Sequence, residues 1–172
     1  MKIKIMIDSA SDVSEVEAKQ LGLEFVPIQV RFEDEEYFDG VDLLPKEFYE
    51  KLVASKEMPQ TSLINEYRWD EVFASATKDG SELVVIALSS KLSGTYQSAL
   101  EASKKYNGKV HVVDSMNAAL GERLLGLYAL QLANSGMDAK DIAKELNAKK
   151  SKVCVYAVID TLKYLKKGGR IS

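Results

Sequence analysis

The chain has 172 residues, of which 46% are hydrophobic, and its 23 Lys and Arg against 26 Asp and Glu give a formal net charge of −3. This length suits one ordinary domain with a sizeable core, and the acidic balance argues against nucleic-acid binding. No apolar run reaches the length of a membrane span, and the N-terminus has no secretory or transit signal, so we expect no membrane insertion.

The sequence contains one cysteine and one histidine, Cys154 and His111. A lone cysteine forms no internal disulfide and fits a cytoplasmic protein, and its place in an apolar run predicts an inert buried thiol. A single histidine without cysteine partners gives no zinc site and little basis for a Ser-His-Asp hydrolase. From these two residues we therefore expect neither a zinc site nor a catalytic thiol.

Strands and helices alternate in the expected secondary structure. Apolar runs predict strands at 2–7, 24–32, 83–88, 110–113 and 153–158. Helical spacing recurs at 13–21, 45–54, 65–78, 97–106, 119–133, 138–148 and 160–167. This alternation predicts an α/β fold with a mostly parallel sheet flanked by helices.

Residues that cap, end or interrupt secondary structure refine these expectations. Asp12 is the expected cap of the 13–21 helix and Gly22 its stop, and Pro27 interrupts the second strand. Residues 37–40 read as a short hairpin arm, and residues 59–62 as a loop.

Ligands of parallel sheets bind outside the carboxyl ends of the strands. That rule selects four loops rich in short polar side chains, at 8–12, 89–95, 114–115 and 160–161. The second of them leads into a helix, whose free backbone N–H groups favour an anion. Gly94 allows a close approach to the backbone, whereas the simplest role of Ser90 or Ser93 is to cap the helix.

Two kinds of ligand fit such a crevice. An acyl carboxylate needs converging donors, which Thr61 or Ser62, Ser93, the Gly94 N–H and Arg170 supply, and an apolar site for its tail. Tail candidates are the apolar residues of 120–132 and 159–165, although we expect most of them to be ordinary core.

The alternative is a magnesium-dependent hydrolase or phosphotransferase that uses Asp8 and Asp114. Ala10 breaks the Asp-x-Asp pattern of such phosphatases, and neither a phosphate loop nor a dinucleotide fingerprint is present. The simpler role of both aspartates is to cap helices or bind loop amides.

Several motifs occur in the order found in one family, and the chain resembles the DegV family of bacterial fatty-acid-binding proteins. These motifs are Asp-Ser-Ala-Ser-Asp at 8–12, Tyr-Phe-Asp-Gly-Val at 37–41, Pro-Gln-Thr-Ser at 59–62, the serine-rich run at 89–99, Asp-Ser at 114–115 and the run at 160–172 that contains Gly-Gly-Arg.

The resemblance implies a two-domain lipid carrier that holds one long-chain fatty acid, such as palmitate, and that has neither a cofactor nor catalytic residues of its own. It implies that Thr61 and Ser93 bind the carboxylate, with Arg170 in the same region. It also implies, for some members, delivery of the acid to a separate fatty acid kinase.

The chain departs from the family pattern at two places in the sequence and in its length. Leu63-Ile64-Asn65 replaces a polar, Pro-containing run, and Glu122 and Arg123 stand where small residues are usual, so we expect them at the crevice mouth. We assign 1–167 to the N-terminal domain and 168–172 to the start of a connection to an absent second domain. The absent half predicts a homo-oligomer, a partner chain or weak lipid binding, and a truncated interaction domain without ligand is a further alternative.

Overall fold

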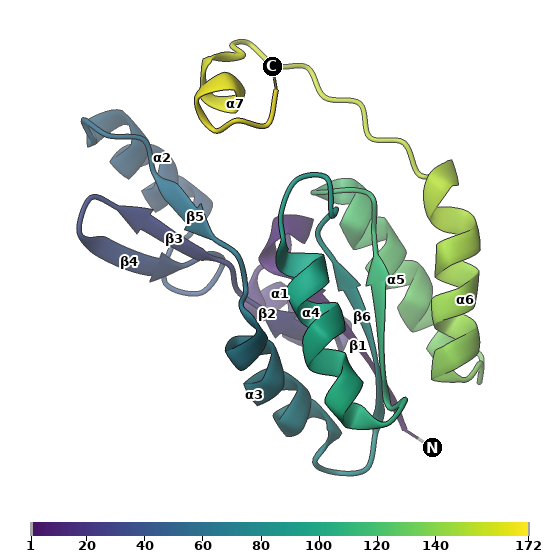
Figure 1. The fold of residues 1–172 in the computed structure, drawn as a ribbon. Coiled ribbons are helices and arrows are strands. Elements are labelled where there is room, and N and C mark those ends of the chain that lie inside the picture. The colour runs from purple at the N-terminus through teal and green to yellow at the C-terminus, as the bar shows by residue number, and fades with distance from the viewer. Residues whose placement is uncertain (1, 172) are drawn as a thin grey trace.

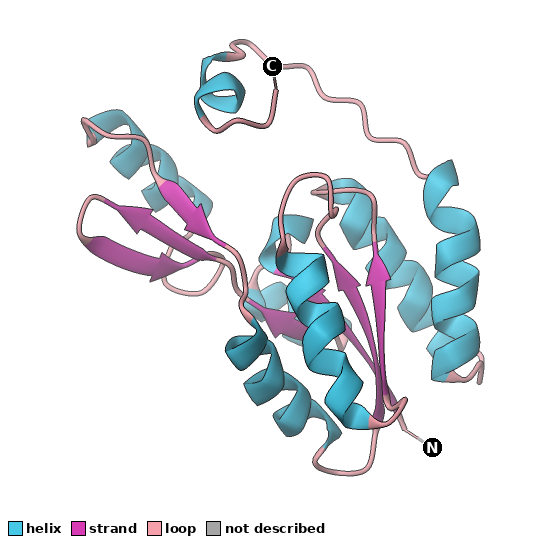
Figure 2. Cartoon of the chain, in the orientation of Figure 1, coloured by secondary structure: helices cyan, strands magenta, loops and turns pink. Residues whose placement is uncertain are grey.

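The computed structural model describes residues 2–171 and contains a four-stranded, wholly parallel sheet. Its strands, in the order β2-β1-β6-β7, are β2 (Glu24–Val26), β1 (Ile3–Asp8), β6 (Glu82–Ala87) and β7 (Val110–Asp114). The expected α/β architecture is confirmed (Figures 1 and 2). All four strands run the same way, so their carboxyl ends meet at one edge of the sheet.

Helices cover both faces of this sheet (Figure 1). One face carries α3 (Glu66–Thr77) and α4 (Thr95–Ser103), and the other carries α1 (Glu15–Leu21), α5 (Leu120–Asn134) and α6 (Ala139–Lys149). Three short 3₁₀ turns join these elements: η1 (Ser9–Ser11), η2 (Lys104–Tyr106) and η3 (Lys150–Lys152).

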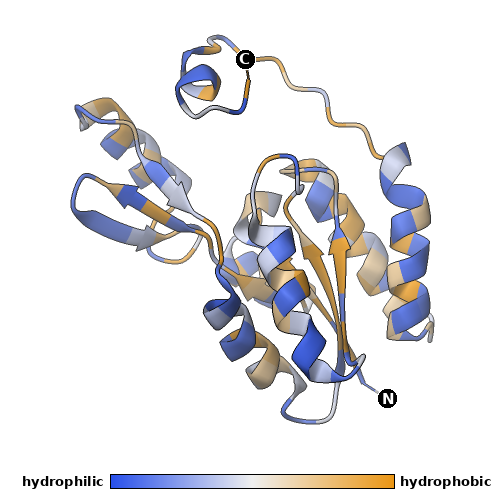
Figure 3. Ribbon diagram, viewed as in Figure 1, coloured by the Kyte–Doolittle hydropathy of each residue, from blue (hydrophilic) through white to orange (hydrophobic). Residues whose placement is uncertain are grey.

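The core has two halves because successive strand residues point to opposite faces. In β6, Val84 and Ile86 pack toward Leu125 of α5, whereas Val85 packs toward Trp69 of α3. The central strands are therefore buried on both sides, and Figure 3 shows β6 and β7 as the most hydrophobic elements, with hydrophilic residues over much of the helices around them.

A second, smaller sheet stands beside the first (Figure 1). It is antiparallel, in the order β4-β3-β5, with β3 (Gln29–Phe32), β4 (Glu35–Phe38) and β5 (Gln60–Ser62). Helix α2 (Pro45–Ala54) follows its hairpin, with Pro45 in its first turn as expected. The predicted single strand at 24–32 is therefore two strands in different sheets, separated at Pro27, and the predicted loop at 59–62 contains β5.

The prediction for residues 153–158 was wrong. This segment is extended and exposed, and no strand pairs with it among residues 2–171. Its β-branched composition suits a strand, but composition supplies no hydrogen-bond partner. Cys154 is accordingly exposed rather than buried. The chain then turns back through the short helix α7 (Lys163–Lys167).

Two predicted helix caps were also wrong. Ser14, not Asp12, caps α1 by accepting the N–H of Glu17. Asp12 instead ends η1 in the left-handed region at φ 57°. The N-cap of α4 is Gly94, which offers no capping side chain.

Across the described residues, no helix is both long and apolar enough to span a lipid bilayer.

Candidate ligand-binding site

A cavity of about 750 Å³ lies between the carboxyl edge of the parallel sheet, the small sheet and the C-terminal turn. We call it the inter-sheet cavity, and it is lined by Ala10, Ile28, Val30, Asp39, Thr61, Ser62, Leu63, Leu88, Leu92, Ser93, Gly94, Leu165, Arg170 and Ile171. All five polar positions singled out from the sequence therefore line one cavity. Its volume falls in the range of roughly 300–1,000 Å³ typical of small-molecule sites.

The wall formed by Ser93 and Gly94 is anchored to the core. The Ser93 Oγ accepts the Thr95 N–H at 3.2 Å and lies 2.9 Å from the Thr95 Oγ1. Thr95 is fully buried, and its carbonyl accepts the Trp69 Nε1–H at 3.3 Å. The first turn of α4 is thus fixed by α3, and a hydroxyl and the start of a helix face the cavity together.

The facing wall comes from β5. Thr61 pairs with Val30 in the antiparallel ladder, and Ser62 pairs with Gln29. Both hydroxyl residues are exposed. Leu63, which follows them, packs against the other wall: the Leu63 Cδ2 lies only 3.2 Å from the position that a Cβ on Gly94 would occupy. The departure at Leu63 thus contributes an apolar contact across the cavity.

Arg170 reaches the cavity because the chain turns back after α7. Its backbone N–H bonds the Leu165 carbonyl at 3.0 Å, and its Nη1 donates to the Gly168 carbonyl. Within residues 2–171 its guanidinium forms no ion pair with an acidic side chain, so its charge remains available to an anion. Figure 1 shows this C-terminal turn above the edge of both sheets.

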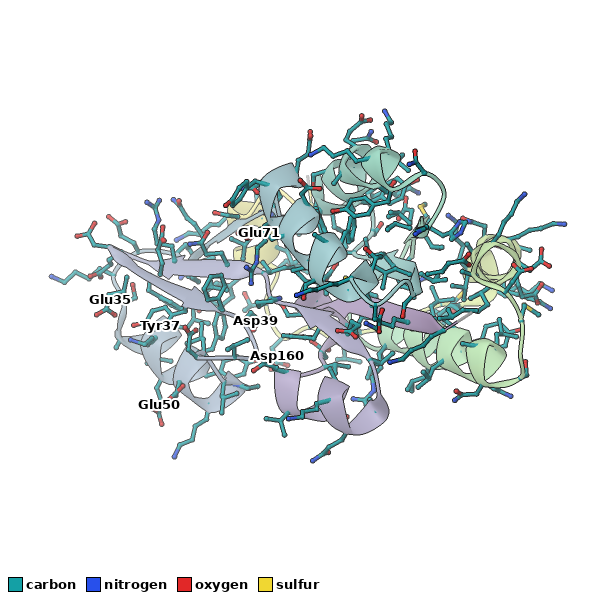
Figure 4. The ribbon with its side chains drawn as sticks, turned by 90° about the horizontal axis from the view of Figure 1, so that it is seen from below. Glu35, Tyr37, Asp39, Glu50, Glu71 and Asp160 are labelled. Atoms are coloured by element: carbon teal, nitrogen blue, oxygen red, sulfur yellow. The ribbon has the colours of Figure 1, made fainter. Side chains whose placement is uncertain are left out.

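Asp39 is a cavity residue that sequence reasoning missed. Figure 4 shows it at the inner end of the small sheet, whereas Glu35, Tyr37 and Glu50 lie farther out. Burial raises the pKa of its carboxyl group, against the hydrogen bond from Ser9 that lowers it, and Asp12 adds to the rise. The signal was the Tyr-Phe-Asp-Gly run at 37–40, which was recognised only as a motif.

The floor of the cavity is held by Asp8. Its Oδ1 accepts the Ala10 N–H at 3.0 Å and its Oδ2 accepts the Leu88 N–H at 2.8 Å, and both donor residues line the cavity. Asp114 likewise accepts the N–H groups of Ser90 and Met116. The expected role of both aspartates in binding loop amides is confirmed. Among residues 2–171 no cluster of acidic, His and Cys side chains is suited to a metal ion.

Three expectations about nearby segments need correction. Residues 120–132 contribute nothing to the cavity wall, because Leu125 and Ala129 are core, and of the 159–165 segment only Leu165 lines it. The 160–161 loop does not follow a strand. Glu122 does not lie at the crevice mouth but is fully buried, and Arg123 forms an ion pair with Glu17 of α1 at 2.5 Å.

Comparisons with known proteins identify the family. The model of a family described as uncharacterised DegV proteins matches residues 2–172. A DegV domain-containing protein of Clostridium perfringens is 38% identical over 178 residues, which cover 99% of this chain and 61% of that protein.

Two solved structures are similar as well. One, described as fatty acid binding by a DegV family protein from Thermus thermophilus, has a TM-score of 0.86 and 30% identity over 98% of this chain and 60% of the other. The other, a stearic-acid-binding protein from Eubacterium ventriosum, has a TM-score of 0.81 and 28% identity over 97% and 59%. The chain thus spans about three fifths of the length of these relatives, and it belongs to the DegV family.

Proposed function

We propose that this protein binds a long-chain fatty acid in the inter-sheet cavity and acts as a carrier rather than an enzyme. The observation that carries this is the cavity lining, in which two hydroxyl-bearing walls and the Arg170 guanidinium converge beside apolar side chains. A carboxylate accepts several hydrogen bonds and favours a cation, while an acyl tail gains free energy from leaving water. The fatty acids named for similar structures support the same ligand class.

In the proposed complex the head group lies between the two polar walls. Thr61 and Ser93 donate their hydroxyl protons to the carboxylate, and Ser62 and the Gly94 N–H are further donors. Arg170 supplies the positive charge from above. The tail runs along the apolar side chains of Ile28, Val30, Leu63, Leu88, Leu92 and Leu165.

Two wider assignments belong to this proposal. We propose that the bound acid is presented to a separate fatty acid kinase, since the head group lies near the open C-terminal turn rather than deep in the core. The lone thiol fits a reducing compartment, and we propose the cytoplasm as the location. No cofactor has a role in this proposal.

The test is mass spectrometry of the protein as purified, followed by palmitate titration after the bound lipid has been removed. We expect a long-chain fatty acid in the organic extract and saturable rebinding. A double variant, Thr61→Ala with Ser93→Ala, should lose rebinding, whereas Ser90→Ala, a change at an exposed serine of the same loop, should keep it. An empty protein that also fails to bind palmitate would contradict the proposal.

A further inference from the structure

Glu122 is an acidic side chain that is buried without a hydrogen-bond partner for its carboxyl group among the described residues. It lies in the first turn of α5, its exposed fraction is 0%, and neither carboxyl oxygen has a hydrogen-bond partner in residues 2–171. An ionised carboxylate without a partner is very costly to bury, so such a group either finds a proton or finds a donor. Within residues 2–171 no hydrogen bond to either oxygen is formed, and the nearby Asp8 backbone amide only partly offsets the effect of burial on the pKa, which leaves the proton.

The neighbour that acts on Glu122 most strongly is Asp8. Burial raises the pKa of Glu122 well above its ordinary value, and the negative charge of Asp8 raises it further. Burial also raises the pKa of Asp8 to about 6, although the Leu88 and Ala10 amides favour its ionised form. Asp8 is therefore the anion of the pair at neutral pH, and Glu122 is the acid that keeps its proton.

The loops around this pair are the loops that form the cavity floor. Asp8 holds Ala10 and Leu88 through their amides. The linker before α5 bonds both loops through its backbone, because the Ala119 N–H donates to the Ala10 carbonyl at 2.6 Å and the Ser89 N–H donates to the Asn117 carbonyl at 3.0 Å. Glu122 lies directly beyond this linker, so whatever displaces it strains both loops at once.

We propose that Glu122 is a positioning residue of the inter-sheet cavity: its neutral carboxyl group donates a hydrogen bond to the Asp8 carboxylate, and this one shared proton holds the 8–12 and 88–94 loops in the conformation that binds the ligand. Each oxygen of Asp8 accepts one amide and has a second lone pair free for this bond. Loss of the proton places two like charges in a buried site and loosens the floor. Only the effect on binding rests on the proposed function.

The surrounding charges do not remove this repulsion. Asp12 at the end of η1 and Asp39 on the cavity wall add negative charge to the neighbourhood. Arg123, the cation on the same turn of α5, is engaged by Glu17 of α1. No nearby cation in the described part of the chain therefore offsets the repulsion that would arise if Glu122 and Asp8 were both ionised.

The first test compares the pH dependence of stability in ligand-free protein. A carboxyl group with a raised folded pKa binds more protons when folded, so stability falls as pH rises from its ordinary value, about 4.3 for glutamate, toward the raised value. We expect the denaturant midpoint of wild-type unfolding to decrease steadily as the pH rises above about 4.3, the ordinary glutamate pKa, and we expect Glu122→Gln, which keeps a neutral donor, to reduce this decrease. Glu66→Gln is the matched control, because Glu66 is an exposed acid in the first turn of α3.

A wild-type slope that is unchanged in Glu122→Gln would overturn the proposal. Carbon-13 NMR of labelled glutamate carboxyl groups gives an independent readout that does not depend on stability. We expect one resonance of a neutral acid at pH 7 that is absent from Glu122→Gln. A Glu122 resonance that titrates near the ordinary glutamate pKa would also overturn it.

Palmitate binding measured as a function of pH separates this inference from the proposed function. Above the raised pKa, palmitate affinity of wild type should fall by up to about tenfold per pH unit, and Glu122→Gln should reduce that fall. Binding with the same pH profile in both proteins would overturn the positioning role alone. Wild-type protein that binds no fatty acid at any pH would overturn the proposed function and the positioning role together, while the stability and NMR data would still decide whether the proton is shared.

Discussion

The two walls of the inter-sheet cavity differ in how firmly the rest of the protein holds them. The wall with Ser93 and Gly94 rises from β6, whose residues 83–87 are fully buried, and from a helix start bonded to Trp69. The wall with Thr61 belongs to the small sheet. Helix α2, which follows the hairpin of this sheet, has no buried residue, and its Val53 is 87% exposed. The C-terminal turn that carries Arg170 is similarly exposed.

This difference separates fixed groups from adaptable ones. Backbone amides and a serine on a rigid edge are held in place before the ligand arrives, so little ordering is needed to use them. Thr61 and Arg170 stand on elements with few buried apolar contacts, which is where proteins open locally at low cost. We therefore expect the carboxylate to be located by the fixed wall and enclosed by the other one.

The largest expected effect comes from breaking the support of the fixed wall. Trp69→Ala removes a fully buried indole that packs on Phe73 and donates to the Thr95 carbonyl. We expect a loss of about 3–5 kcal/mol in the free energy of unfolding, measured by chemical denaturation with circular dichroism. Tyr67→Ala, on the exposed face of the same helix, is the control, and an equal loss in both would contradict the account.

The second effect concerns binding by the fixed wall. Ser93→Ala removes a hydroxyl that faces the proposed head group, and we expect palmitate affinity to weaken by about 1–3 kcal/mol in calorimetric titration. Unchanged affinity would show that the head group lies elsewhere in the cavity. Ser90→Ala, in the same loop, should retain the affinity of wild type.

The third effect concerns the adaptable wall. Arg170→Gln removes an exposed charge, so we expect a smaller loss of about 1 kcal/mol, or roughly fivefold, and one that shrinks with added salt. Hexadecanol, which has no charge, should bind both proteins equally. Lys166→Gln provides the control within the same turn, and a comparable loss in that variant would indicate a general field rather than a contact.

The smallest effect is expected on the outer side of the small sheet. Tyr49 of α2 is 64% exposed and touches Phe48 through its ring. Tyr49→Ala should change the free energy of unfolding by no more than about 0.5 kcal/mol and leave palmitate binding unchanged. A loss as large as that in Trp69→Ala would mean that α2 is packed against something in solution.

The parallel sheet was predictable from the sequence because its signals are local. Residues 83–88 form an unbroken apolar run. The helices around it are followed within three residues by Gly22, Gly80 and Gly136 or begin at capping residues such as Asn65 and Asp138. The rule for parallel sheets selected the loop that contains Ser93, whereas Thr61 and Arg170 were predicted from the needs of a carboxylate ligand and from the family resemblance. Their roles in binding stay predictions.

Other features could not be read from the sequence because they depend on distant partners. Residues 153–158 have strand composition but no strand beside them, and Pro27 separates two sheets rather than bending one strand. Glu122 was expected at the crevice mouth, but its burial depends on the packing of α5 against β1 and η1, more than a hundred positions away in the chain. Pairing and burial of this kind are properties of tertiary packing, not of local pattern.

The central claim is that the fixed wall locates a fatty-acid head group, and amide NMR during palmitate titration tests it most directly. A second apolar cavity of about 350 Å³, between α5 and α6 and lined by Leu124, Tyr128 and Val153 among others, provides an internal comparison. We predict that the largest amide shifts appear at Ser93, Gly94 and Thr61 and saturate together, and that the Tyr128 amide does not shift. Shifts confined to the α5–α6 cavity, with Ser93 and Gly94 unchanged, would contradict it.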